Sequence, residues 1–204
     1  MTDEVRLGPA SVRILRVVRG LPRDGAQVAR AIDDFAPDLV ALSIGPEELE
    51  ALALYDGGPA EPSNFEEEVY VAGLSAWETP VKPPPCFVEA LRVSQARGIR
   101  IEGIDFDEEA YTDVYTACVS AVELILQGRT EARLTKRRFR AMTPEAFVLE
   151  WDAEVNRAPG FARLQKEREA HMARRLHALA GAARRVLAVV ELERAQGVLA
   201  GLRA

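Results

Sequence analysis

The sequence predicts an α/β protein with a mostly parallel central sheet, helices on both faces and an added helical segment. Two observations predict this class. Apolar runs of strand length alternate along the chain with amphipathic helical segments, an order typical of parallel sheets with right-handed crossovers. The run DLVALSI (residues 38–44) is apolar without polar alternation until Ser43, which is typical of a strand covered on both faces.

The N-terminal elements follow from short local signals. VRILRVV (12–18) is rich in β-branched residues and predicts the first strand. After a Gly- and Pro-containing turn, Asp24 is expected to cap a helix over residues 25–35, whose apolar residues share one face. The segment 46–55 predicts another helix, because Pro stands at its first turn and acidic residues follow at its positive end.

Residues 56–85 are rich in proline and predict an insertion or lid. Within them a helix is expected over 64–77, where Ser63 and Glu66 have capping-box spacing. The chain then predicts a helix over 86–98, a strand over 99–105 and one long helix from Asp107 to Gly128.

The C-terminal part begins with a charged helical segment at about 129–160 and continues into a long helix, an apolar strand and a small closing helix. Leu164, Met172, Leu176 and Leu179 form an apolar stripe on the long helix, and Arg168 falls on the same stripe. A buried arginine needs an anionic partner or an anionic target. Arg168 is therefore the first candidate site residue.

Composition limits the classes of function. The chain has 204 residues, 48% of them apolar, and a net charge of −6, which gives no global attraction to nucleic acid or anionic membranes. TKRRFR (135–140) is one local basic cluster, interpreted as a solvated helix face. No apolar run has membrane-spanning length and no signal peptide is recognised, so a cytoplasmic location is expected. Cys86 and Cys118 are too few for a structural zinc site or a disulfide framework.

Several segments together resemble the TraB/PrgY family. EREAHMARRLHALAGAARRVLAVV (167–190) resembles a family segment in which an ER pair and a nearby MA precede a helix, a strand and a G-x-x-H. PDLVALSIGPEELEAL (37–52) is similar to the family's second strand and its following helix, and CFVEALRVSQARGIRIEGIDFD (86–107) to a helix and strand that end in aspartate-arginine-aspartate. The resemblance implies a single TraB-like domain over residues 1–204.

The family site, however, is incomplete in this chain. The wider superfamily includes Tiki-type proteases, erythromycin-esterase-like enzymes and heme-binding ChaN-like proteins. Its better-characterised members use two G-x-x-H motifs, a strand-end glutamate and a helix arginine, some with a divalent metal. Here VRGLP (18–22) and ELER (191–194) stand where the histidine motifs would be, Ser43 replaces the glutamate and Glu48 the arginine. The resemblance thus implies a member that has lost the histidine-based active site.

The remaining candidate residues gather at one place. Ligands of an open parallel sheet bind beyond the carboxyl ends of the strands. The residues expected at that edge are Arg19, Ser43, Glu47, Asp105, Asp107, Glu191 and Glu193, with Arg168 reaching in from its helix. His171 and His177 lie six residues apart on one helix and cannot bind a metal from a common face.

Two functions follow from this set. The first is a non-catalytic binding or regulatory interaction module for an unknown small molecule or peptide, expected to form a homodimer, in which Arg168 pairs with Asp105 or Glu191 and holds the fold together. The alternative is a diverged hydrolase with a divalent metal such as magnesium or manganese. In that case Asp105, Asp107 and Glu191 are the metal ligands, and the catalytic candidates are Arg168, Glu167 and Glu191.

Overall fold

The computed structural model describes residues 2–56, 65–134, 137 and 139–204, and it confirms the α/β class with a mostly parallel sheet. The five strands are β1 (Thr2–Leu7), β2 (Ala10–Val17), β3 (Leu39–Leu42), β4 (Arg100–Gly103) and β5 (Arg185–Glu191). The helices of the described residues are α1 (Pro22–Phe35), α2 (Pro46–Ala53), α3 (Phe65–Leu74), α4 (Pro85–Arg97), α5 (Glu108–Cys118), α6 (Ala121–Leu134), α7 (Pro144–Val155), α8 (Pro159–Ala180) and α9 (Leu192–Arg203).

The strand order β1-β2-β5-β3-β4 places β5 at the centre of the sheet. The β2–β5, β5–β3 and β3–β4 pairs are parallel, and only β1 is antiparallel to its neighbour β2. All four residues of β3 are buried, as its continuous apolar run predicts. The edge strand β1 was not predicted, because TDEVRL offers few apolar residues and lies half in solvent.

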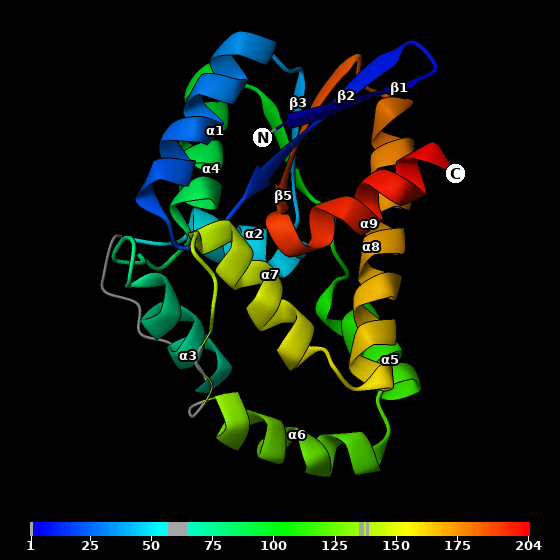
Figure 1. The fold of residues 1–204 in the computed structure, drawn as a ribbon. Coiled ribbons are helices and arrows are strands. Elements are labelled where there is room, and N and C mark those ends of the chain that lie inside the picture. The colour runs from blue at the N-terminus through cyan, green and yellow to red at the C-terminus, as the bar shows by residue number, and fades with distance from the viewer. Residues whose placement is uncertain (1, 57–64, 135–136, 138) are drawn as a thin grey trace.

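Two helical layers cover the sheet, α1 and α4 on one face and α8 and α9 on the other (Figure 1). Successive residues of β5 supply both layers: Leu187 packs with the core beneath α1 and α4, and Ala188 with the core beneath α8 and α9. The predicted stripe of α8 is buried at Leu164, Met172, Leu176 and Leu179. These layers leave the carboxyl ends of the strands to be covered by other segments.

The added helical segment and the proline-rich segment provide that cover. Tyr70 and Leu74 of α3 form a further core with Phe147 and Trp151 of α7, onto which Leu21 packs from the turn after β2. In Figure 1 these helices lie beyond the ends of the strands, with α6 below them. The described part of the proline-rich segment therefore borders the predicted ligand edge, and its role as a lid stays a prediction.

Two sequence predictions about helix ends were wrong. Asp24 does not cap α1, whose N-cap is Leu21; its Oδ2 instead accepts a hydrogen bond from Val18 N at 2.6 Å and ties the end of β2 to α1. The predicted long helix to Gly128 is two helices. Ser120 and Glu123 form a reciprocal capping box that starts α6 after a break, with Ser120 N donating to Glu123 Oε2 at 2.9 Å.

Other predicted ends are confirmed. Gly98 closes α4 in the left-handed conformation at the predicted end, residue 98, and within the predicted helical segment 129–160 Thr143 caps α7 by accepting from Ala146 N at 3.1 Å. Ser63 of the proposed capping box, and Lys136 and Arg138 of the basic cluster, lie outside the described residues.

Candidate functional site

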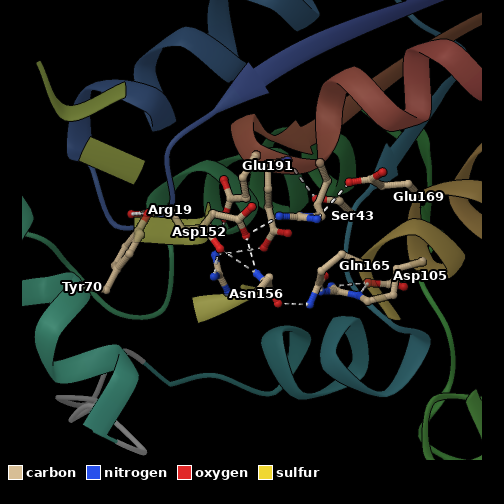
Figure 2. A network of polar contacts seen from close by, with 12 residues as sticks. Arg19, Ser43, Tyr70, Asp105, Asp152, Asn156, Gln165, Glu169 and Glu191 are labelled. Atoms are coloured by element: carbon tan, nitrogen blue, oxygen red, sulfur yellow. Dashed lines mark hydrogen bonds and ion pairs between the residues drawn. The ribbon is translucent and has the colours of Figure 1, made fainter. Parts of the chain in front are cut away.

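The carboxyl ends of four strands bring polar side chains to one edge of the sheet. Arg19 follows β2, Ser43 follows β3, Asp105 follows β4, and Glu191 is the last residue of β5. The parallel register aligns these ends, as the sequence predicts. Figure 2 shows the labelled side chains facing one another at this edge.

Arg19 joins β2 to the start of α9. Its Nε lies 2.9 Å from Glu191 Oε1, and its Nη2 lies 3.8 Å from Glu193 Oε1. Gly20 follows with a φ of 91°, a left-handed conformation that a residue with a Cβ rarely adopts, and turns the chain away. The hydroxyl of Tyr70 donates to the carbonyl of Arg19 at 3.1 Å and fixes that turn.

Glu191 and Glu193 form a close acidic pair behind Arg19. Their side chains are only 5% and 4% exposed. Burial, together with the charge of Glu191, raises the pKa of Glu193 to about 7. Ser43 Oγ accepts a hydrogen bond from Glu191 N at 3.1 Å, so the end of β3 fixes the point where β5 becomes α9.

Arg168 meets Asp105, one of the two partners expected from the sequence. Its Nε donates to Asp105 Oδ2 at 2.9 Å, and its Nη1 donates to Gln165 Oε1 at 2.9 Å. Gln165 continues to Asn156 at 3.0 Å, and Asn156 to Asp152 at 2.8 Å. A line of polar contacts thus crosses from β4 through α8 to α7 (Figure 2).

Arg194 is a second buried arginine, which sequence reasoning missed. Its side chain is 5% exposed and pairs with Asp152 and with Glu169, whose Oε1 lies 2.9 Å from Nη1. Burial raises the pKa of both Asp152 and Glu169. The signal that marked Arg168 could also have marked Arg194, because it lies on the same buried face of α9 as Val198 and Leu202.

Two adjoining cavities open at this edge and share Arg19 and Trp151. The first, about 700 Å³, lies between α2, α3 and the proline-rich segment and is mainly apolar, with Leu52, Tyr70 and Phe87 in its wall. The second, about 640 Å³, is bordered by the polar residues just described: Arg168, Asp152, Asn156, Gln165, Glu191, Glu193 and Arg194. We call the two cavities together the cleft.

Three predicted site residues lie elsewhere. Asp107 is exposed and caps α5, accepting from Ala110 N at 2.7 Å. Glu167 is exposed on α8 and Glu47 is half-buried at the start of α2, and neither borders the cleft. The neighbour of Glu47, Glu48, borders the first cavity instead, and its Oε2 accepts from Gly45 N at 2.9 Å.

The predicted divalent metal does not fit these positions. Asp105 is engaged by Arg168, Asp107 serves as a helix cap, and Glu191 faces Arg19. Within the part of the chain that the structure describes, no three His, Cys, Asp or Glu residues are grouped so that they could hold a metal ion. The proposed ligand set is therefore corrected: its three members do not converge.

The histidines and cysteines also lie apart from the cleft. The ring of His171 packs on Phe106 with centroids 4.1 Å apart, and His177 is exposed. Cys86 and Cys118 are buried free thiols, and burial raises the pKa of Cys86 far above its ordinary value. None of the four borders the cleft.

The fold and cleft define an α/β protein with a polar and apolar cavity pair at the carboxyl edge of a mostly parallel sheet. Comparison with protein-family models gave no match, and neither did comparison with curated proteins. None of the described helices combines the length and the apolar composition that crossing a membrane requires.

Proposed function

We propose that the protein is a non-catalytic binding module of TraB/PrgY-like ancestry that takes a small molecule or a peptide segment in the cleft. One observation carries this proposal. Trp151 and Glu193 border the second cavity, and each has a buried polar atom, Nε1 and Oε2 respectively, that makes no hydrogen bond within the described residues. Leaving a buried polar atom unpaired costs about 1–3 kcal/mol, which a bound ligand would recover.

The chemistry of the cleft supports binding over catalysis. Arg19, Arg168 and Arg194 each face a carboxylate of the protein. A guanidinium held in this way stabilises the cleft, and it is not free to stabilise charge that develops on a substrate. The histidines that serve the family's chemistry are absent from these positions.

The test introduces a large side chain at an exposed position of α2, from which it can fill the first cavity. Ala51 borders this cavity but is exposed on α2, so Ala51→Trp is expected to fill the cavity without disturbing the core. Ala53→Trp is the matched control, because Ala53 is exposed on the same helix and borders neither cavity.

The measurement is a thermal-shift screen with amines, carboxylic acids, sugars, nucleosides and short peptides at millimolar concentration. We expect at least one compound to stabilise wild type and Ala53→Trp, but not Ala51→Trp. A screen without any stabilising compound, or equal shifts in both variants, would contradict binding in the cleft.

A diverged hydrolase stays the second candidate, now without the metal ligands first assigned to it. It is favoured by Glu193, because a buried carboxyl with a pKa of about 7 suits general acid–base catalysis near neutral pH. Hydrolysis of p-nitrophenyl esters that is lost in Glu193→Gln, with the variant folded at the assay temperature, would support it.

A homodimer and a cytoplasmic location stay predictions. The side chains of Val122, Leu124 and Ile125 on α6 are exposed apolar groups of the kind that self-association would cover. Sedimentation equilibrium of wild type and Ile125→Glu would measure whether a dimer forms and whether α6 contributes to it.

A further inference from the structure

We infer that the cleft takes a small organic cation, with a protonated amine at Glu193 and an apolar body in the first cavity. This inference rests on the proposed function, because it assumes that the cleft binds a small molecule. It adds the chemical class of that molecule, which follows from the charges, the unpartnered oxygen of Glu193 and the shape of the cleft.

The charges around the cleft favour a cation. Its walls and their ion-pair partners hold seven carboxyl groups against four cationic groups. The carboxyl groups are Glu48, Glu67, Asp105, Asp152, Glu169, Glu191 and Glu193, and the cationic groups are Arg19, Lys82, Arg168 and Arg194. Each of the cationic groups faces at least one of these carboxylates. An anionic ligand would therefore have to displace a protein carboxylate, whereas a cationic ligand would offset an existing excess.

The unpartnered oxygen gives a second, independent reason. Glu193 borders the second cavity, and its Oε2 is buried and accepts no hydrogen bond from the described residues, although Arg19 lies near Oε1 of the same carboxyl group. An ammonium group has three donors and no acceptor, so it can satisfy this oxygen with a charge-assisted hydrogen bond. A ligand carboxylate would bring only another acceptor.

The first cavity fits an apolar body. Its wall includes the side chains of Leu52, Tyr70, Val71, Phe87 and Trp151, together with prolines of the proline-rich segment. Arg19 and Trp151 border both cavities, so a ligand that passes them reaches from this apolar wall to Glu193. The aromatic faces of Tyr70 and Trp151 also attract cations.

The affinity for an amine should depend on pH, and the protonation of Glu193 determines the direction of that dependence. The groups that face Glu193 are Glu191 on β5, Arg19 after β2, Tyr70 on α3 and Arg194 on α9. Glu193 is protonated below a pKa of about 7, and the proton competes with the ammonium for the same carboxylate. Affinity for an amine should therefore rise as the pH rises through about 7.

The experiment uses the full chain with Trp77→Phe, which leaves Trp151 as its only tryptophan and as a reporter in the cleft wall. The probes are 2-phenylethylamine, its neutral analogue 2-phenylethanol and the anionic 3-phenylpropionate, titrated by fluorescence and checked by calorimetry. We expect the amine to bind about tenfold tighter than the alcohol, and the acid to bind most weakly.

Two variants locate the effect. Glu193→Gln should reduce the preference for the amine to about twofold or less and remove its pH dependence. Glu167→Gln removes the same charge from an exposed position outside the cleft and should keep both. Retention of the full preference in Glu193→Gln would overturn the role given to Glu193.

The remaining outcomes separate this inference from the proposed function. Equal or tighter binding of the alcohol or the acid would overturn the cation inference and still support a binding cleft. A fluorescence response to none of the three probes would also overturn it, whereas the proposed function is decided by the wider screen with Ala51→Trp and Ala53→Trp.

Discussion

Arg168 donates from Nε to Asp105 Oδ2 over 2.9 Å, and this ion pair holds the long helix α8 against the end of β4. The arginine side chain is 21% exposed and the aspartate side chain 5% exposed. Asp105 Oδ1 also accepts from Phe106 N at 2.8 Å, so the carboxylate is fixed on both sides. The pair is thus part of the cleft's framework.

Arg168→Met should destabilise the fold by about 3 kcal/mol, because it leaves the Asp105 carboxylate buried without its cation. This value is at the lower end for a broken buried pair, since part of Arg168 meets solvent. Urea unfolding followed by circular dichroism measures the loss.

The double variant Asp105→Asn/Arg168→Met provides the control. It removes both charges, so its free energy of unfolding should exceed the value that two additive losses predict by at least about 1 kcal/mol. Additive losses would show that the two side chains are not coupled.

Gly197→Ala should disturb the second arginine pair. A Cβ at Gly197 would lie 1.9 Å from Glu169 Oε2, so the carboxylate that pairs with Arg194 must move. We expect a loss of about 2 kcal/mol despite the better helix propensity of alanine.

Gly128→Ala is the matched control, because a Cβ there meets no atom within 4 Å and the residue also lies inside a helix. It should stabilise the protein by up to about 1 kcal/mol. If thermal unfolding shows the same gain for Gly197→Ala, Glu169 has room to move and the predicted conflict is wrong.

Local patterns predicted those parts of the fold that depend on nearby residues. The apolar run of β3 and the apolar stripe of α8 predict burial because each pattern can be recognised within one continuous segment of the sequence. The break before α6 was overlooked although Ser120 and Glu123 have capping-box spacing, since the apolar pattern continues across it.

The site depended on contacts that sequence spacing does not encode. That Arg194 meets both Asp152 and Glu169 is set by how α7, α8 and α9 pack. Glu48 borders the cleft in place of the predicted Glu47, and the two side chains differ by about 100° around the helix, the rotation between consecutive residues. The strand-end residues Arg19 and Glu191, in contrast, follow from topology alone.

Magnesium or manganese should leave the thermal midpoint unchanged. The three carboxylates first assigned as ligands are held by Arg168, by the start of α5 and by Arg19, so none is placed to share a cation with the others. A saturable rise in the midpoint that is lost in Asp105→Ala and Glu191→Ala, with both variants folded, would contradict this expectation and restore the metal-dependent hydrolase.

Glu193 should make stability fall as the pH rises. Its pKa is about 7 in the folded protein and 4.5 is the ordinary value, so the folded state holds a proton that the unfolded state releases between these values. The stabilising contribution is complete below about pH 4.5, declines up to about pH 7 and is constant above it, a change of about 3 kcal/mol.

Glu193→Gln removes this titration. Asp152, Glu169 and His171 titrate in both proteins, so their contributions largely cancel in the difference between the two unfolding free energies. Measured by urea unfolding from about pH 5 to about pH 8, the advantage of wild type over Glu193→Gln should shrink or reverse, and a constant difference would show that Glu193 is already ionised at the low end.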